Sequence, residues 1–193
     1  MDSITSLLTM VALQGGAALF ALGMAERIFP VIPSAVLFAF LGAGIATRRW
    51  SVEEAMLYSL AGGLSASCLL YLVGRRIHED RLFKLLPGGR SERLRNRITE
   101  NAVTFSFGMQ LMPAARLVGP ALSGTLGVTF PAFLVTTAAG MALWNASFIA
   151  IGYATFTGIV DGVDAALAVT GALALAGLAQ IAFFMILRGR GGR

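Results

Sequence analysis

An arginine stands between two prolines near the middle of a long apolar stretch. The stretch covers residues 105–127, and Pro113 and Pro120 flank Arg116 within it. A charge at the bilayer centre costs about 2.5–3.5 kcal/mol on insertion scales, and an internal proline removes a helical hydrogen bond. Non-helical backbone survives at membrane depth only where protein or a water-filled cavity surrounds it. We therefore predict a broken, re-entrant hairpin over residues 103–127, with Arg116 facing a polar cavity near its tip.

The composition of the whole chain favours a membrane protein. Of the 193 residues, 56% are hydrophobic and only 13% are charged, which is too little charge for a soluble domain. The net charge of +5 comes from basic residues at the ends of apolar segments, which indicates orientation signals and not nucleic-acid binding. The single cysteine, Cys68, excludes an intrachain disulfide and argues against a zinc site. We expect one membrane domain over residues 1–193.

Other apolar segments are long enough to cross a bilayer. At 1.5 Å per residue, each can span a hydrocarbon core of about 30 Å. The predicted spans are residues 4–25, 52–74, 130–156 and 163–187. Gly15 and Gly16 interrupt the first of them, and Ser51 with Glu54 predicts a capping box at the start of the second.

A proline pair also follows the first apolar segment. That segment is expected to end at Glu26 and Arg27, after which Pro30 and Pro33 break the chain. An apolar run continues to residue 46, and helices commonly start after such prolines. We therefore predict a second re-entrant element over residues 28–46, with Glu26 just upstream.

Aromatic and basic residues mark expected membrane interfaces. Arg48, Arg49 and Trp50 follow the second re-entrant element and are predicted to anchor it at the interface. Tyr71 and Tyr153 lie near the ends of two predicted spans, and we expect them to be interface anchors and not ligands.

The charged segment over residues 75–100 is predicted to be a cytoplasmic basic loop. It carries eight basic and four acidic residues. The positive-inside rule places this loop and the arginine-rich C-terminus in the cytoplasm. If the element over residues 103–127 enters and leaves on the cytoplasmic side, two crossings remain and both basic ends lie inside. The same topology puts Arg48 and Arg49 outside, against the rule.

The predicted order of elements occurs twice along the chain. A broken element is followed by a span in each copy, and the two copies enter from opposite faces. The spacing from Pro33 to Tyr71 nearly equals that from Pro113 to Tyr153. Inverted repeats of this kind are typical of secondary transporters, whose sites lie where two discontinuous segments meet. We predict an all-α polytopic membrane protein with two opposed re-entrant helical hairpins in an inverted-repeat arrangement plus about four transmembrane helices.

These motifs resemble a known family of membrane proteins. They are Glu26-x-x-x-Pro30-x-x-Pro33, Tyr71-x-x-Gly74-Arg75, Pro113-x-x-Arg116 and Gly152-Tyr153. Together, over residues 26–158, they resemble the DedA family, also called the VTT-domain or SNARE-associated Golgi protein-like family. The resemblance implies two opposed re-entrant hairpins and the movement of phosphate-bearing lipids between leaflets.

The resemblance also suggests which residues matter, and where this chain departs. In such members an acidic residue in the first hairpin and two arginines in the second are important, and Glu26 and Arg116 match one position of each kind. The second hairpin of the family usually reads Arg-Phe-x-Pro-x-x-Arg. Gln110 stands here in place of its first arginine, and Ser67 stands where an acidic residue is often found.

Arginine 116 and the resemblance together predict a membrane lipid translocase or scramblase. Its substrate would be a phosphate-bearing lipid, either polyprenyl phosphate or phospholipid. Arg116 would hold the phosphate, because guanidinium groups make bidentate contacts with phosphate oxygens, and Glu26 would carry a proton. The predicted substrate-binding residues are Arg116, Gln110, Glu26, Pro113, Pro33 and Asn145.

Other interpretations stay open at this point. The chain could be a proton-coupled small-solute secondary transporter or a non-transporting membrane scaffold. Arg116 could be structural, satisfied by backbone carbonyls or by Glu26, and Asn145 could simply join two helices. Glu26 could be an interface residue beside Arg27.

The remaining expectations concern chemistry, partners and location. No Ser-His-Asp, metal-ligand or phosphate-loop pattern occurs, so we expect no enzyme, no catalytic residue, no metal and no cofactor. The expected partners are anionic or phosphate-bearing membrane lipids, with protons as a coupling ion and a homo-oligomer as open alternatives, and no nucleic acid. The expected location is the inner (plasma) membrane, with a cytoplasmic C-terminus.

Overall fold

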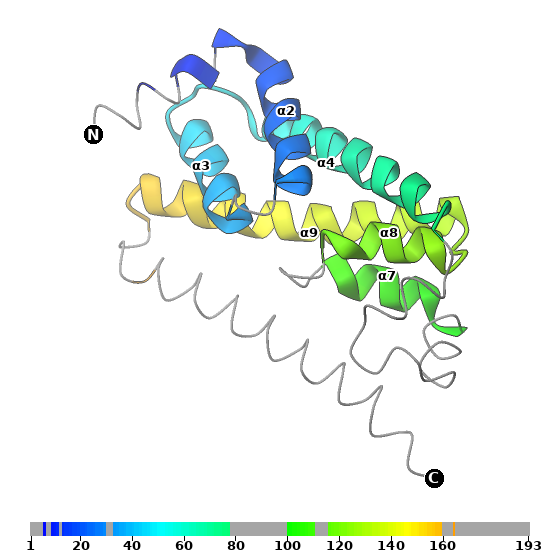
Figure 1. Ribbon diagram of the computed structural model, residues 1–193. Coiled ribbons are helices and arrows are strands. Elements are labelled where there is room, and N and C mark those ends of the chain that lie inside the picture. The colour runs from blue at the N-terminus through cyan, green and yellow to red at the C-terminus, as the bar shows by residue number, and fades with distance from the viewer. Residues whose placement is uncertain are drawn as a thin grey trace. The chain divides into compact units, whose positions relative to one another are not determined.

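The part of the chain that the structure describes is helical. The computed structural model describes residues 6, 9–11, 13–29, 33–77, 100–110, 116–159 and 164. Its bounded helices are α2 (Gly15–Ile28), α3 (Ser34–Ala46), α4 (Val52–Gly74), α7 (Ala102–Gln110), α8 (Val118–Thr125) and α9 (Phe130–Phe156) (Figure 1). No strand occurs in these ranges, so the all-α prediction is confirmed for them. Pro113, most of the basic loop and nearly all of the predicted span 163–187 lie outside the described residues.

Helices α4 and α9 coincide with two of the predicted spans. They contain 23 and 27 residues, and both are long and apolar enough to cross a membrane. The predicted capping box at the start of α4 is present. The backbone N–H of Ser51 donates to Glu54 Oε2 at 2.8 Å, and the backbone N–H of Glu54 donates to Ser51 Oγ at 3.1 Å. These two bonds satisfy amide groups that the first turn of a helix leaves without partners.

The first apolar segment differs from its predicted outline. The expected interruption occurs at Gln14 and Gly15, where the helical run breaks and Gly15 has a φ of +58°, a value that favours glycine. The segment does not end at Glu26, however. Helix α2 continues through Glu26 and Arg27 to Ile28, so both charged residues lie within its last two turns.

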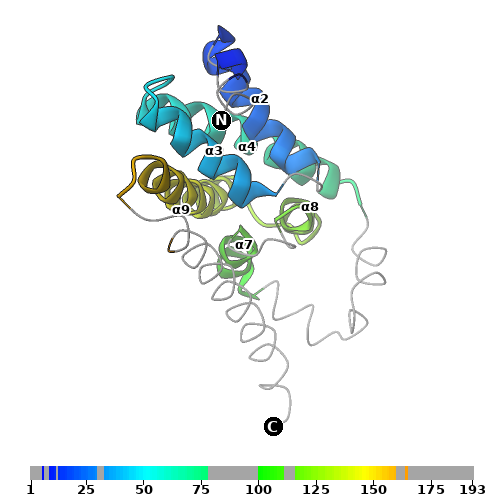
Figure 2. The same cartoon turned by 90° about the vertical axis from the view of Figure 1, so that its left-hand side faces the viewer.

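Two pairs of short helices are joined by proline-containing segments. In the first pair, α2 and α3 flank residues 29–33, and α3 begins directly after Pro33, whose carbonyl oxygen accepts the Leu37 N–H at 3.1 Å. In the second pair, α7 and α8 flank residues 111–117. Each pair packs against itself, and α7 and α8 run side by side in Figures 1 and 2.

The chain divides into two compact units, and the division falls within α4 and within α9. Unit 1 comprises Met1–Ala66 and Met141–Ala172, and unit 2 comprises Ser67–Gly140 and Leu173–Arg193. Unit 1 therefore holds α2 and α3 with the first part of α4 and the second part of α9. Unit 2 holds α7 and α8 with the second part of α4 and the first part of α9.

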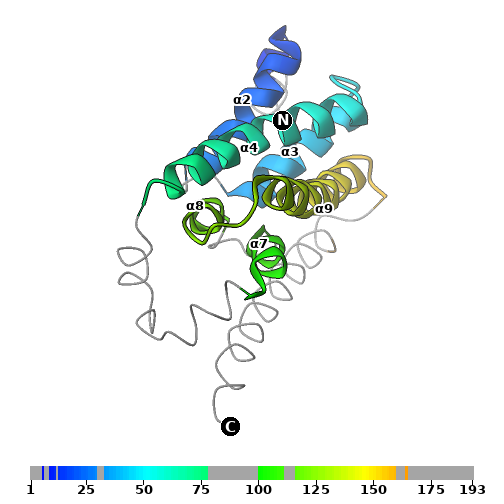
Figure 3. The ribbon, with the colours of Figure 1, turned by 90° about the vertical axis from the view of Figure 1, so that its right-hand side faces the viewer.

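Unit 1 is assembled through backbone contacts at glycines. A Cβ atom at Gly42 of α3 would collide with the Ile149 carbonyl of α9, and one at Gly152 of α9 would collide with the Ala39 carbonyl. The other short helix meets α4 in the same way. A Cβ atom at Gly62 would collide with the carbonyl of Phe20 in α2, which lies beside α4 in Figure 3. Small residues thus let the helix backbones touch, as is common in membrane helix packing.

Unit 2 repeats this construction with its own helices. A Cβ atom at Gly124 of α8 would collide with the Tyr71 carbonyl of α4, and one at Gly74 of α4 would collide with the Ala121 carbonyl. Helix α7 in turn packs on α9, where a Cβ atom at Gly140 would lie 2.6 Å from the Cβ atom of Gln110.

The two long helices bury the same positions. Adding 78 to each buried residue number of α4 gives a buried residue of α9. The pairs are Ala55 and Phe133, Ser59 and Thr137, Gly62 and Gly140, Gly63 and Met141, Ala66 and Trp144, Ser67 and Asn145, Tyr71 and Ile149, and Gly74 and Gly152. In this comparison Tyr71 corresponds to Ile149, whereas the proline spacing paired it with Tyr153.

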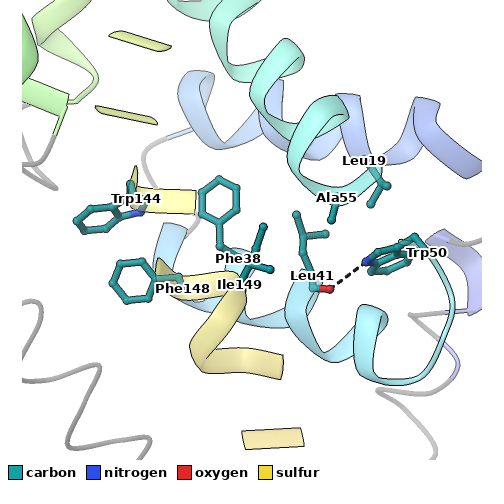
Figure 4. Packing of buried hydrophobic residues seen from close by; sticks show 8 residues of the cluster. All are labelled: Leu19, Phe38, Leu41, Trp50, Ala55, Trp144, Phe148 and Ile149. Atoms are coloured by element: carbon teal, nitrogen blue, oxygen red, sulfur yellow. Dashed lines mark hydrogen bonds between the residues drawn. The ribbon is translucent and has the colours of Figure 1, made fainter. Parts of the chain in front are cut away.

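The apolar core of unit 1 buries an aromatic residue that we expected at the membrane interface. Trp50 belongs to the same apolar cluster as Leu41, Phe38 and Phe148, and its Nε1 donates to the Leu41 carbonyl at 2.9 Å (Figure 4). The prediction of an interface anchor is therefore wrong for Trp50, because the loop after α3 folds its ring back onto α3. Arg48 and Arg49 are exposed, as expected.

The core of unit 2 is built around Tyr71. Its ring stacks on Phe133 with 4.5 Å between ring centroids, and its hydroxyl donates to the Val128 carbonyl. Tyr71 is 1% exposed, so its predicted role as an interface anchor is also wrong. Tyr153, by contrast, is 40% exposed.

Backbone contact at Gly62 leads to a testable difference between two glycines. Gly62→Ala should lower the free energy of unfolding by about 1–3 kcal/mol, because the new methyl group has no room. Gly108 also lies within a helix but has no atom within 4 Å of a Cβ position. Gly108→Ala should leave the protein unchanged or raise its stability by about 0.5–1 kcal/mol. Thermal unfolding of the full chain in detergent measures both, and equal effects would contradict the packing described.

Candidate functional site

Arg116 is a buried cation at the start of α8. It is 2% exposed and lies in the turn directly before Val118, the first residue of α8. Pro120 falls in the first turn of that helix, where a proline costs no helical hydrogen bond. The proline therefore shapes the start of α8 and does not break it. The N-terminal end of a helix carries partial positive charge, which adds to that of the guanidinium group.

Gln110 forms the end of α7 in the same unit. It is 1% exposed, and its Nε2 donates to Thr137 Oγ1 of α9 at 3.5 Å. Its side-chain stem lies against Gly140, one turn further along α9. Gln110 thus makes a buried polar contact with α9, and glycine at position 140 makes room for its side chain.

Unit 2 also buries a series of hydroxyl groups. Ser106 Oγ and Ser123 Oγ are 2.8 Å apart and join α7 to α8, and Ser123 Oγ also donates to the Gly119 carbonyl at 2.8 Å. Thr125 Oγ1 donates to the Gly74 carbonyl at 2.8 Å. Unit 2 thus contains buried hydroxyl groups beside its apolar core.

Unit 1 buries an ion pair that sequence analysis did not anticipate. Arg27 Nε lies 3.1 Å from Glu26 Oε2, and the side chains are 1% and 6% exposed. A Cβ atom at Gly63 of α4 would lie 3.8 Å from Arg27 Cγ, which places the arginine stem against α4. Glu26 is therefore not an interface residue, and Arg27 was missed as a candidate. Its spacing from buried Leu19 and Gly23 offered a signal, because positions 19, 23, 26 and 27 share one helix face.

Asn145 joins two helices within unit 1. Its Nδ2 donates to Ser59 Oγ of α4 at 3.3 Å, and the residue is fully buried. Its Oδ1 has no hydrogen-bond partner in the described part of the chain, and neither has the Oγ of buried Ser67. Ser67 and Asn145 occupy equivalent positions of α4 and α9, because 67 plus 78 is 145.

The structure sorts the predicted site residues into two groups. Arg116 and Gln110 belong to unit 2, whereas Glu26, Pro33 and Asn145 belong to unit 1. Pro33 is exposed and acts at the N-terminus of α3, and Pro113 lies outside the described residues. No group of three His, Cys, Asp or Glu side chains that could hold a metal ion occurs among the residues that the structure describes.

Long apolar helices, glycine-mediated helix contacts and buried charged residues together indicate a helical membrane protein. The VTT domain matches residues 32–154, and the chain belongs to this family, the DedA family. The family assignment agrees with the resemblance seen in the sequence motifs. No solved structure matches the fold significantly.

Three similar proteins, from two strains of Lactococcus lactis and from Staphylococcus aureus, carry two different names. An "Alkaline phosphatase-like protein" of Lactococcus lactis subsp. cremoris is 27% identical over 172 residues, 80% of each chain. A protein of the same name from Lactococcus lactis subsp. lactis is 28% identical over 141 residues, 68% of this chain and 66% of its own. "Undecaprenyl phosphate transporter A" of Staphylococcus aureus is 23% identical over 147 residues, 72% of each chain.

The burial of the Glu26–Arg27 ion pair leads to a prediction about stability. Arg27→Gln should cost about 3–5 kcal/mol, because it leaves the Glu26 carboxylate buried without its cation. The double variant Glu26→Gln/Arg27→Gln should recover most of that loss, since neither side chain is then charged. Unfolding of the three proteins in detergent gives the coupling energy. Additive effects of Glu26→Gln and Arg27→Gln would contradict a buried ion pair.

Proposed function

We propose that this protein is a lipid translocase or scramblase that moves a phosphate-bearing lipid between membrane leaflets. The lipid headgroup would pass through the protein interior while the tails stay in the bilayer. Membership of the VTT-domain family and the similarity to a protein named for undecaprenyl phosphate transport support this function. Polyprenyl phosphate and phospholipid share the chemistry that the site would recognise, a phosphate ester on an apolar chain.

Helix length supports a re-entrant arrangement of the two short pairs. At 1.5 Å per residue, α2 and α3 are about 21 and 20 Å long, and α7 and α8 about 14 and 12 Å. Each is shorter than a hydrocarbon core of about 30 Å, whereas α4 and α9, at about 35 and 40 Å, exceed it. We therefore propose that each pair enters and leaves on one face, and that the two pairs enter from opposite faces as an inverted repeat.

The observation that carries the proposed function is the burial of Arg116. A charged side chain at membrane depth is costly and usually marks a substrate pathway. Arginine suits a phosphate group, because its planar guanidinium donates two parallel hydrogen bonds to phosphate oxygens. We assign the phosphate to Arg116 at the N-terminal end of α8. Gln110, where the family usually has arginine, would add hydrogen bonding without charge.

The remaining roles belong to the same proposal. Glu26 would be the group through which a proton is coupled to lipid movement. The protein would act as a transporter without covalent chemistry, in spite of the phosphatase-like names of two similar proteins. We propose the inner (plasma) membrane as its location, with the basic loop and the C-terminus in the cytoplasm, and we expect anionic lipids as its partners.

Leaflet exchange in proteoliposomes tests the function. Labelled polyprenyl phosphate and a labelled phospholipid are each placed in one leaflet, and their appearance in the other is followed over time. The wild-type protein should accelerate exchange of at least one. Arg116→Gln should slow that exchange about tenfold or more, because a charge-assisted hydrogen bond contributes about 1.5–3 kcal/mol.

The matched control is Arg49→Gln, which removes one exposed arginine and should leave the exchange rate unchanged. Equal exchange by wild type and Arg116→Gln would contradict the assigned role of Arg116. If folded wild-type protein exchanged neither lipid, the small-solute transporter or the scaffold would replace the translocase.

A further inference from the structure

The buried ion pair of unit 1 has unfavourable geometry for a purely structural role. Glu26 and Arg27 are neighbours in α2, and side chains one residue apart on a helix do not face each other. Desolvating two such charges costs several kcal/mol per ion, and a well-packed apolar pair is often as stable or more so. A buried pair of this kind is therefore weak evidence for stability and invites another explanation.

The surroundings of Arg27 are built from three helices. Gly63 of α4 lies beside the Arg27 stem, and a Cβ atom there would also collide with the Met141 side chain of α9. One turn from Gly63 along α4 is Ser59, and one turn from Met141 along α9 is Asn145, which are hydrogen-bonded to each other. Helices α2, α4 and α9 thus bring a buried cation and a buried polar pair to neighbouring turns of unit 1.

Asn145 offers a hydrogen-bonding atom to this region. Its Oδ1 has no partner in the described part of the chain. Because the two ends of an amide are assigned from hydrogen bonding, the group can also be turned to donate from Nδ2 while Oδ1 accepts the Ser59 hydroxyl. Either orientation leaves one polar amide atom for a further partner. Because buried polar groups are almost always paired, this amide can accept a further polar partner, a water molecule or a ligand group.

We propose that Arg27 is a second phosphate-binding residue, and that Glu26 is its internal counter-charge, which the phosphate displaces. This rests on the proposed function, because the ligand is the same class of phosphate-bearing lipid. A phosphate group carries at least the charge of a carboxylate and can face the guanidinium with two oxygens, which Glu26 cannot do as readily from the adjacent position. The Asn145 amide then donates to a phosphate oxygen. Unit 1 thereby has an anion site of its own, separate from Arg116 in unit 2.

Binding of a short-chain probe tests the assignment without requiring transport. The full chain in nanodiscs is titrated with decyl phosphate, and the neutral decyl glucoside reports binding that depends on the tail alone. All variants are made in an Arg116→Gln background, so that only the unit 1 site remains. This background should still bind decyl phosphate in preference to decyl glucoside.

Removing the Glu26 counter-charge and removing the Arg27 cation should change the affinity for decyl phosphate in opposite directions. Adding Glu26→Gln should strengthen decyl phosphate binding about tenfold, because the carboxylate no longer competes for Arg27. Adding Glu26→Gln together with Arg27→Gln should abolish that preference, and this neutral pair avoids an uncompensated buried charge. Asn145→Asp should weaken binding, whereas Ser147→Asp, at an exposed position of α9, should not.

The outcomes separate this inference from the proposed function. If wild type binds decyl phosphate and the Arg116→Gln background does not, or if adding Glu26→Gln with Arg27→Gln leaves the preference intact, Arg27 is not a phosphate ligand and the role of Arg116 is untouched. If binding depends on Arg27 while leaflet exchange proceeds normally without Arg116, the inference stands and the assigned role of Arg116 fails. No preference for decyl phosphate in any protein would overturn the unit 1 site.

Discussion

Backbone contact between short and long helices is the interaction on which the rest of this structure depends. The carbonyl groups of Ile149 and Tyr71 occupy the space that a side chain at Gly42 or Gly124 would fill. Helices of 8–14 residues bury little apolar surface in a lipid environment, where packing and not hydrophobicity drives association. Close approach at glycines gives them that packing, and it fixes which face of each long helix is buried. The same face, shifted by 78 residues, is buried in both α4 and α9.

Glycines on the long helices lie beside buried polar side chains of the short helices. In unit 1, the space at Gly63 of α4 is taken by the Met141 side chain of α9, and the stem of Arg27 lies at van der Waals distance from the same position. In unit 2, Gly140 leaves room for Gln110. The Gln110 side chain is thus accommodated at a position where a long helix has no side chain of its own.

Local signals in the sequence were enough to predict part of this arrangement. The bounds of α4 and α9 follow from their apolar length, and the capping box follows from the spacing of Ser51 and Glu54. Residues whose burial depends on distant segments were not predictable in this way. Arg27 and Trp50 look like interface residues, because charges and tryptophans commonly end apolar segments. Both are nevertheless buried in the protein: the Arg27 stem lies beside Gly63, and Trp50 Nε1 donates to the Leu41 carbonyl. Gln110 and Asn145 make buried polar contacts within the protein, and the binding roles assigned to Arg116, Gln110, Glu26 and Asn145 remain predictions.

The most direct test of the proposed inverted repeat is to determine on which side of the membrane the ends of each helix pair lie. Single cysteines at Gln14, Thr47, Asn101 and Thr129, in a Cys68→Ala background, are labelled in intact cells or oriented vesicles with a membrane-impermeant thiol reagent. All four positions are exposed in the structure. Two re-entrant pairs in opposite orientations predict that positions 14 and 47 react from one face, and positions 101 and 129 from the other. Labelling of 14 and 47 from opposite faces would mean that α2 and α3 together cross the membrane, and would contradict the inverted repeat.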